Sequence, residues 1–359
     1  MSTSFDDFRE TLSSDQKTVL DRILDEETRQ KSREILKHIE TDQKHLEIVN
    51  FCANFFLPGE LLPEKTGYLL YLIEPLYTLG IKNFDLGFFR RENASLILTE
   101  CKSSISDPGK LVDDLNKAID ATKSNKNAIE KIFGNKIADP IEFALCIPAI
   151  DAPIVHKEII QRQASICTWA AAQFERKIRL LSDQTDTRNE ILAGRLHKDG
   201  NLNSFLGNGV ESKLRAIRSI SILPSSHMCT LMVHVGELIY RGSKAQGSYG
   251  EFQYSDVFSI LTKEMGRMTG LSEKDFDSLV TSILTTGKRK GIFKDLTDDV
   301  QELPRKTFQI AGRRSSAETV HRDVKETYIN HNAREKAESE SLLRYKKEKG
   351  ITTLNSHFK

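Results

Sequence analysis

The chain has 359 residues, of which 38% are hydrophobic and 29% are charged, and its net charge at pH 7 is +1. This length and apolar content allow a sizeable core and suggest two or three domains. A net charge near zero argues against a protein coated with positive potential, although local basic surfaces remain compatible with it. The apolar stretch 67–81 is too short and too interrupted to span a membrane, and residues 1–10 lack the features of a signal peptide. We therefore expect an intracellular, cytoplasmic protein.

The N-terminal part of the chain predicts helices. Apolar residues recur at helical intervals within residues 5–48, which indicates two or three amphipathic helices in an accessory region, 1–58. The proline and glycine of 56–63 suggest a boundary. The apolar segment 66–80 predicts a helix that bends at Pro75 and ends at its last residue, Gly80.

The next region, 59–181, predicts an α/β domain. Residues 83–91 and 95–103 are typical of two strands joined as a hairpin, and Asp107 followed by Pro108 predicts a helix start. Further elements are expected as follows: a strand at 140–150, a strand or helix start at 164–173, and a helix at 173–181. This order predicts a mixed sheet covered by helices.

The C-terminal half predicts a different architecture. Residues 182–224 are rich in glycine and asparagine and suggest a loop-rich connection. Three helices, the second and third with Ser255 and Ser272 as N-caps, are then followed by a two-stranded ribbon, which indicates a winged-helix domain at 225–311. The glycine-rich stretch 242–250 lacks a phosphate-cradling pattern, so no nucleotide cofactor is expected. Residues 312–359 predict a charged, solvated helical tail.

The five cysteines occur singly, without CxxC or Cys/His spacing: Cys52, Cys101, Cys146, Cys167 and Cys229. Such spacing indicates neither a disulfide framework nor a structural zinc site. We expect them to be buried thiols.

Three charged residues lie inside the two apolar strands of the hairpin: Asp85, Glu100 and Lys102. Because side chains alternate between the faces of a strand, Glu100 and Lys102 share one face, and an antiparallel hairpin brings Asp85 close to them. Two buried carboxylates repel each other unless a cation lies between them. Oxygen ligands favour Mg²⁺ or Mn²⁺ over zinc, so the pattern predicts a metal-dependent phosphodiester hydrolase with Asp85, Glu100 and Lys102 as catalytic residues. In this interpretation Lys102 orients the attacking water or helps to deprotonate it. The alternative is an ordinary surface ion pair between Glu100 and Lys102.

These residues resemble the pattern of the PD-(D/E)XK phosphodiesterases, the restriction-endonuclease-like superfamily. That family has an aspartate on its second core strand and Glu-x-Lys on its third, and the resemblance covers roughly residues 60–175. Phe84 stands where the motif name has proline. The resemblance implies that Asp85, Glu100 and the backbone carbonyl of Cys101 bind the metal. It also makes Glu74, on the expected preceding helix, a candidate metal ligand; the alternative is that this residue simply marks the bend at Pro75.

The winged-helix interpretation implies contacts with DNA from the third helix and the ribbon. The expected nucleic-acid-binding residues are Lys274, Ser278, Lys288, Arg289, Lys290, Arg305 and Lys306. A nuclease core joined to a DNA-binding domain implies directed cleavage, as in a restriction or defence endonuclease, and a homodimer would allow both strands to be cut. Two alternatives stay open: a catalytically inert DNA-binding or regulatory protein, and a nuclease that acts on RNA, repair junctions or transposon ends.

Overall fold

The structure is a computed structural model. It describes residues 5–81, 84–174, 177–182, 197–213, 220–246, 250–266, 268–297, 300–312 and 315–349. The chain divides into two compact units. One unit comprises residues 1–41, 227–257 and 280–359, and the other comprises 42–226 and 258–279. Among the described helices, none combines the length and apolarity needed to cross a lipid bilayer.

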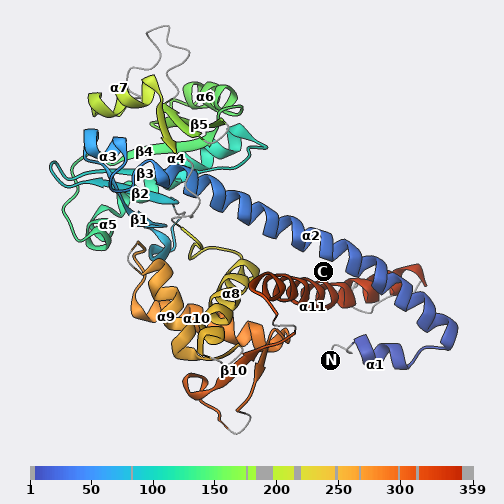
Figure 1. Cartoon of the computed structure of the whole chain (residues 1–359). Coiled ribbons are helices and arrows are strands. Elements are labelled where there is room, and N and C mark those ends of the chain that lie inside the picture. Colours follow the sequence, from blue (N-terminus) through green and yellow to red (C-terminus); the bar gives the residue numbers. More distant parts are fainter. Residues whose placement is uncertain are drawn as a thin grey trace. The chain divides into compact units, whose positions relative to one another are not determined.

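The unit built on 42–226 contains a seven-stranded mixed sheet in which the strands follow chain order (Figure 1). The strands are β1 (Leu69–Ile73), β2 (Leu86–Arg90), β3 (Ser95–Cys101), β4 (Glu142–Pro148), β5 (Cys167–Phe174), β6 (Lys177–Ser182) and β7 (Val210–Lys213). The pairs β3–β4 and β4–β5 are parallel, and the other neighbours are antiparallel. The expectation of a mixed α/β fold is confirmed.

The helices of this unit connect and cover the strands. Between residues 55 and 226 the described helices are α3 (Leu61–Thr66), α4 (Pro108–Ser124), α5 (Lys126–Phe133), α6 (Ala152–Gln161) and α7 (Gly200–Asn208), with a short 3₁₀ helix at Tyr77–Leu79. The predicted start of α4 is confirmed, since Asp107 caps it by accepting a hydrogen bond from the Lys110 N–H at 2.9 Å. Parallel pairing of β3 with β4 requires such a crossover connection.

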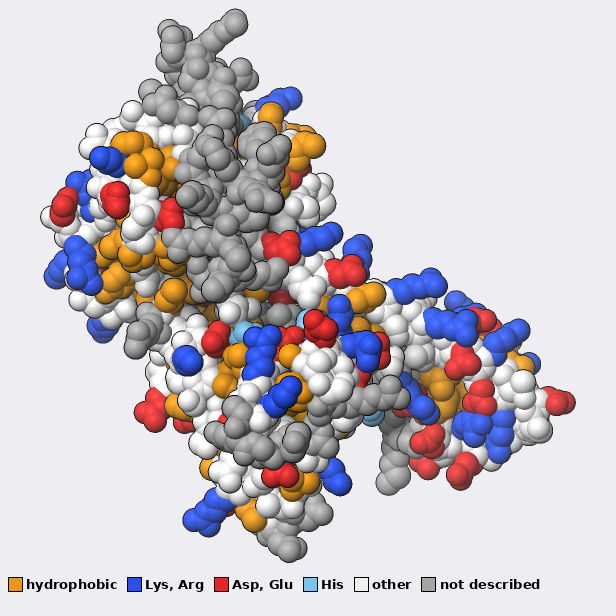
Figure 2. All heavy atoms as spheres, in the orientation of Figure 1, with side chains coloured by type: hydrophobic (Ala, Val, Ile, Leu, Met, Phe, Trp, Pro, Cys, Tyr) orange, Lys and Arg blue, Asp and Glu red, His pale blue; other side chains and the backbone are white. Residues whose placement is uncertain are grey.

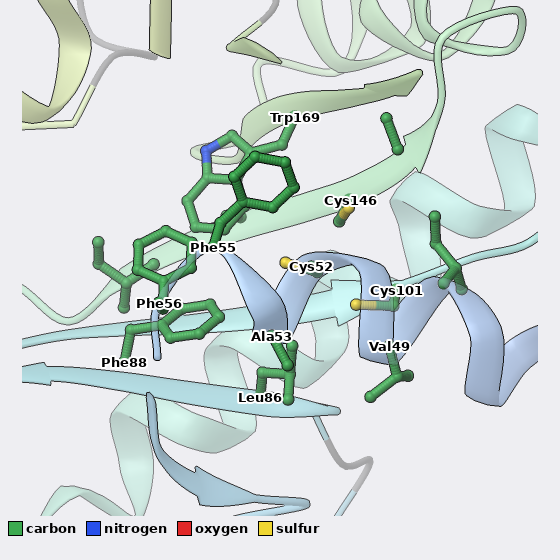
Figure 3. Packing of buried hydrophobic residues seen from close by; sticks show 14 of the residues in the cluster. Val49, Cys52, Ala53, Phe55, Phe56, Leu86, Phe88, Cys101, Cys146 and Trp169 are labelled. Atoms are coloured by element: carbon green, nitrogen blue, oxygen red, sulfur yellow. The ribbon is translucent and has the colours of Figure 1, made fainter. Parts of the chain in front are cut away.

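The strands alternate as the sequence predicts. On one face, Leu86, Phe88 and Ile97 pack with the C-terminal part of the long helix α2 (Ser14–Asn54) (Figure 3). On the other, Phe89 and Leu98 pack with apolar residues of α4, α5 and α6. The sheet is therefore covered on both sides, and the region expected to be accessory contributes part of α2 to its core.

Three expected elements of this unit are wrong. Residues 69–73 form strand β1, not a helix, because they pair with β2. The expected stop at Gly80 is present, since this glycine ends the short 3₁₀ helix in a left-handed conformation. Residues 177–182 continue the sheet as β6 instead of forming a helix. The expected loop-rich connection contains α7 and β7. All five residues of β1 are apolar, so periodicity alone cannot distinguish this strand from a buried helix.

The other unit contains α1 (Phe5–Glu10), α2 as far as Thr41, α8 (Met228–Gln246) and α11 (Ala317–Glu348). The predicted helical N-terminus is confirmed. The C-terminal helix is not fully solvated as expected, because seven of its residues are buried: Val320, Val324, Tyr328, Ala333, Ala337, Ser341 and Tyr345. Tyr345 packs with Leu20 and Ile23 of α2. Its neighbour Arg344 forms ion pairs with Glu26 and Glu27, each at 3.0 Å.

A small antiparallel sheet also belongs to this unit, with strand order β8–β10–β9. Its strands are β8 (Glu251–Gln253), β9 (Phe293–Asp295) and β10 (Thr307–Ile310), and the helices α9 (Tyr254–Met265) and α10 (Glu273–Arg289) lie between β8 and β9 in the chain. The expected ribbon is present, but it has a third strand. Ser272 caps α10 as predicted, by accepting a hydrogen bond from the Asp275 N–H, and the Asp275 carboxylate in turn accepts one from the Ser272 N–H. Helix α9, in contrast, begins before Ser255.

Candidate active site

The register of the β2–β3 hairpin brings the predicted catalytic residues together. Leu86 pairs with Thr99, so Asp85 and Glu100 lie at adjacent positions where β2 begins and β3 ends. Their exposed fractions are only 6% and 3%. The backbone N–H of Cys101 donates to Asp85 Oδ2 at 2.6 Å, and Lys102 Nζ forms an ion pair with Glu100 Oε1. The predicted convergence of these three charged residues is therefore present.

Helix α2 supplies a fourth polar residue, His45, which was not predicted. Its Nε2 lies 2.9 Å from Asp85 Oδ1. Burial alone would lower the pKa of His45, but the hydrogen bond and negative charge of Asp85 outweigh this effect and raise it. One signal was available, because His45, Val49, Cys52 and Phe56 recur at helical spacing. This spacing places the histidine on the stripe of α2 that faces the sheet.

Glu74 adjoins the site, but it follows strand β1 instead of lying on a helix. Its backbone has a φ of 45°, and its N–H donates to the carbonyl oxygen of Asp85 at 2.8 Å. Its carboxylate accepts a hydrogen bond from the Ser225 N–H at 2.8 Å and contacts the Ser225 hydroxyl. Burial raises the pKa of Glu74 to about 7, and the nearby negative charge of Asp85 adds to the increase. Ser225 was not predicted as a neighbour of this site.

This shift predicts that Glu74→Gln changes the pH dependence of stability. The folded-state pKa of Glu74 lies above the ordinary value of 4.5. Its contribution to the free energy of unfolding is therefore fully present below pH 4.5 and is lost as the pH rises through 7. Glutamine does not ionise, so from pH 4 to pH 8 the variant should gain roughly 3 kcal/mol in unfolding free energy relative to wild type. Urea unfolding in EDTA across this range measures the difference. A difference in unfolding free energy between Glu74→Gln and wild type that stays constant with pH contradicts the prediction.

The donor set of the site is carboxylate and carbonyl oxygen, which suits Mg²⁺ or Mn²⁺. Two of these carboxylates already have partners within the protein: one oxygen of Asp85 contacts the His45 ring, and Glu100 forms an ion pair with Lys102. Within the described ranges, the three carboxylates do not form a group with ligand atoms inside 4.8 Å; three cysteines do. Metal binding at the carboxylates would therefore exchange at least one of these internal contacts for the cation.

The expected nucleic-acid-binding residues fall into two groups. Lys274, Ser278, Lys288, Arg289 and Arg305 are exposed, although Lys288 pairs with Asp295 at 2.8 Å and Arg305 with Glu302 at 3.1 Å.

The other two expected nucleic-acid-binding residues, Lys290 and Lys306, are buried. Lys290, only 1% exposed, pairs with Glu335, and Lys306 pairs with Asp295 at 2.6 Å. Neither ammonium group is available to a phosphate, which corrects the expectation for these two residues. Figure 2 shows basic and acidic side chains interspersed on the visible surface.

Comparisons with known proteins do not add to this geometry. No protein-family model, no curated protein and no solved structure matches the chain.

Proposed function

We propose that this chain is a Mg²⁺-dependent endonuclease that hydrolyses DNA, with a core of the PD-(D/E)XK type. The observation that carries the proposal is the β2–β3 register, which sets the buried Asp85 beside Glu100 and Lys102. The chain order of β1, β2, β3, α4 and β4, with β3 parallel to β4, also supports it. Buried carboxylates need compensation by cations or hydrogen bonds, and a bound metal would take the place of at least one of the contacts that Lys102 and His45 now make with Glu100 and Asp85.

In this proposal Asp85, Glu100 and the carbonyl oxygen of Cys101 hold the metal, and Glu74 is an additional ligand. Mg²⁺, or Mn²⁺ in its place, would supply charge stabilisation at the scissile phosphate and lower the pKa of a bound water. The Cys101 N–H orients Asp85 through its hydrogen bond to Oδ2.

Lys102 acts as a cation in this scheme. Burial opposes its charge, but Glu100 and Asp85 outweigh that effect and raise the pKa of Lys102. A protonated lysine donates hydrogen bonds and stabilises negative charge on the phosphate; it does not accept a proton. We propose that Lys102 orients the attacking water and stabilises the transition state.

We further propose that α8, α9, α10 and the β8–β10–β9 sheet form a winged-helix domain that binds DNA. The order of helices and strands and the antiparallel pairing support this assignment. The exposed candidates for contacts with the DNA backbone are Lys274, Ser278, Lys288 and Arg289 of α10, together with Arg305. Action as a restriction or defence enzyme and assembly as a homodimer remain predictions.

A cleavage assay tests the catalytic proposal. Wild type should cut plasmid DNA in Mg²⁺ and not in EDTA, and Lys102→Met should cut at least about a hundredfold more slowly, because methionine cannot stabilise negative charge in the transition state. Lys110→Met is the matched control, since Lys110 is exposed and lies on α4. Linear DNA, single-stranded DNA and RNA complete the panel. Cleavage of RNA alone refutes the DNA assignment, and equal activity of wild type and Lys102→Met refutes the catalytic one.

DNA binding by the full chain tests the second domain. If Lys274 and Arg289 neutralise phosphates, the double alanine variant should reduce the slope of log affinity against log salt by about 0.9 for each phosphate that is no longer neutralised. Lys336→Ala removes an exposed lysine from α11 and serves as the control. Fluorescence anisotropy in EDTA measures binding without cleavage. An unchanged slope would exclude these residues from the interface.

A further inference from the structure

Three cysteines from distant parts of the chain meet in the core of the sheet unit. Cys52 lies on α2, Cys101 on β3 and Cys146 on β4, and their Sγ atoms all lie within 4.8 Å of one another. Cys101 and Cys146 are paired in the parallel register of β3 and β4. Figure 3 shows the three side chains in the space between α2 and these two strands. All three are fully buried, with no exposed surface.

The ligand chemistry of this cluster differs from that of the carboxylate site. Thiolate ligands select soft metal ions such as Cu⁺ and Zn²⁺ over Mg²⁺. Zinc in a structural site takes four ligands, whereas the group of ligand atoms found in the described part of the chain consists of the three sulfurs alone. Three-sulfur coordination suits a monovalent soft ion, and Cu⁺ accepts three ligands in a plane.

The spacing of the sulfurs fits such an ion. With metal–sulfur bonds of about 2.3 Å, three sulfurs around a central ion lie about 4.0 Å apart. No two of the sulfurs here are more than 4.8 Å apart, so no separation exceeds that spacing by more than about 0.8 Å. Because a net charge is costly in an apolar core, the bound site must stay close to neutral; with Cu⁺ it is neutral when one thiol releases its proton to solvent and binds as a thiolate while the other two coordinate as thiols.

We propose that Cys52, Cys101 and Cys146 form a binding site for one monovalent soft metal ion, and that this ion is Cu⁺. The site links α2 to the neighbouring strands β3 and β4. It does not depend on the nuclease proposal, because none of its side chains is a proposed ligand of Mg²⁺. Cys101 contributes its sulfur here and its backbone carbonyl to the other site.

Anaerobic titration of the full chain with Cu⁺, in the presence of a competing chromogenic chelator, tests the site. Wild type should retain one equivalent, and Cys52→Ala, Cys101→Ala and Cys146→Ala should each weaken binding at least about tenfold. Cys229→Ala is the matched control, because Cys229 is a buried thiol outside the cluster. Cu⁺ should also raise the melting temperature of wild type and of Cys229→Ala, since a ligand that binds the folded state stabilises it.

X-ray absorption on Cu⁺-loaded wild type decides the coordination even if a variant does not fold. Three sulfur neighbours are expected. Failure of wild type to retain Cu⁺, a coordination shell without three sulfurs, or wild-type affinity in folded variants of all three cysteines would overturn the proposal. Tighter binding of Zn²⁺ than of Cu⁺, with a fourth ligand, would overturn the assignment to a monovalent ion.

Discussion

Asp85→Asn is expected to reduce Mg²⁺-dependent DNA cleavage at least about a hundredfold, the size of effect seen when one group that stabilises a transition state is removed. Asparagine has nearly the shape of aspartate, and its carbonyl oxygen can still accept the hydrogen bond that the Cys101 N–H donates at 2.6 Å. What the variant loses is the negative charge that the proposed metal requires. Initial rates of plasmid nicking at saturating Mg²⁺ measure the effect.

The matched control is Asp107→Asn, the same change at the exposed N-cap of α4, where asparagine caps as well as aspartate. It should cut at the wild-type rate. DNA affinity of Asp85→Asn in EDTA should stay close to that of wild type, which separates a defect in chemistry from one in binding. If Asp85→Asn and wild type cut equally fast, Asp85 is not a metal ligand and the proposed site is wrong.

The hairpin that carries this site could be predicted because its information is local. Polar turn residues separate two short apolar strands, and the alternation of side chains within each strand fixes which residues share a face. The capped start of α4 is equally local, since Asp107 and Pro108 are adjacent. The alternation of side chains likewise predicts correctly that Glu100 and Lys102 lie together at the end of the second strand.

The rest of the site depends on contacts between distant residues. His45 reaches Asp85 across 40 positions, and Ser225 reaches Glu74 across 151. No local pattern encodes either separation. The sequence of strand β1 predicts a helix wrongly because all five of its residues are apolar, which leaves no period-two pattern to identify a strand. Lys290 and Lys306 were expected to be exposed because basic residues usually are, whereas both are buried in the fold and form ion pairs with Glu335 and Asp295.

The second large effect is expected in stability. Trp169→Ala should lower the free energy of unfolding by about 3–5 kcal/mol, the cost of removing a large aromatic side chain from a packed core. Trp169 is fully buried on β5, and its ring stacks on Phe56 of the segment that follows α2, with centroids 5.4 Å apart. Its loss would leave a cavity between that segment and the sheet. Urea unfolding followed by circular dichroism measures the change, since Trp169 is the only tryptophan in the chain.

Trp169→Phe separates packing from hydrogen bonding. The indole N–H donates to His197 Nε2 at 3.0 Å, while His197 Nδ1 lies 2.8 Å from Glu142 Oε2. Phenylalanine keeps an aromatic ring but leaves the buried Nε2 without its donor, which should cost about 1–3 kcal/mol. Tyr77→Ala, at a position that is 43% exposed, should change stability by no more than about 0.5 kcal/mol. If Trp169→Ala is as mild as Tyr77→Ala, then the packing of Phe56 against this sheet does not stabilise the fold.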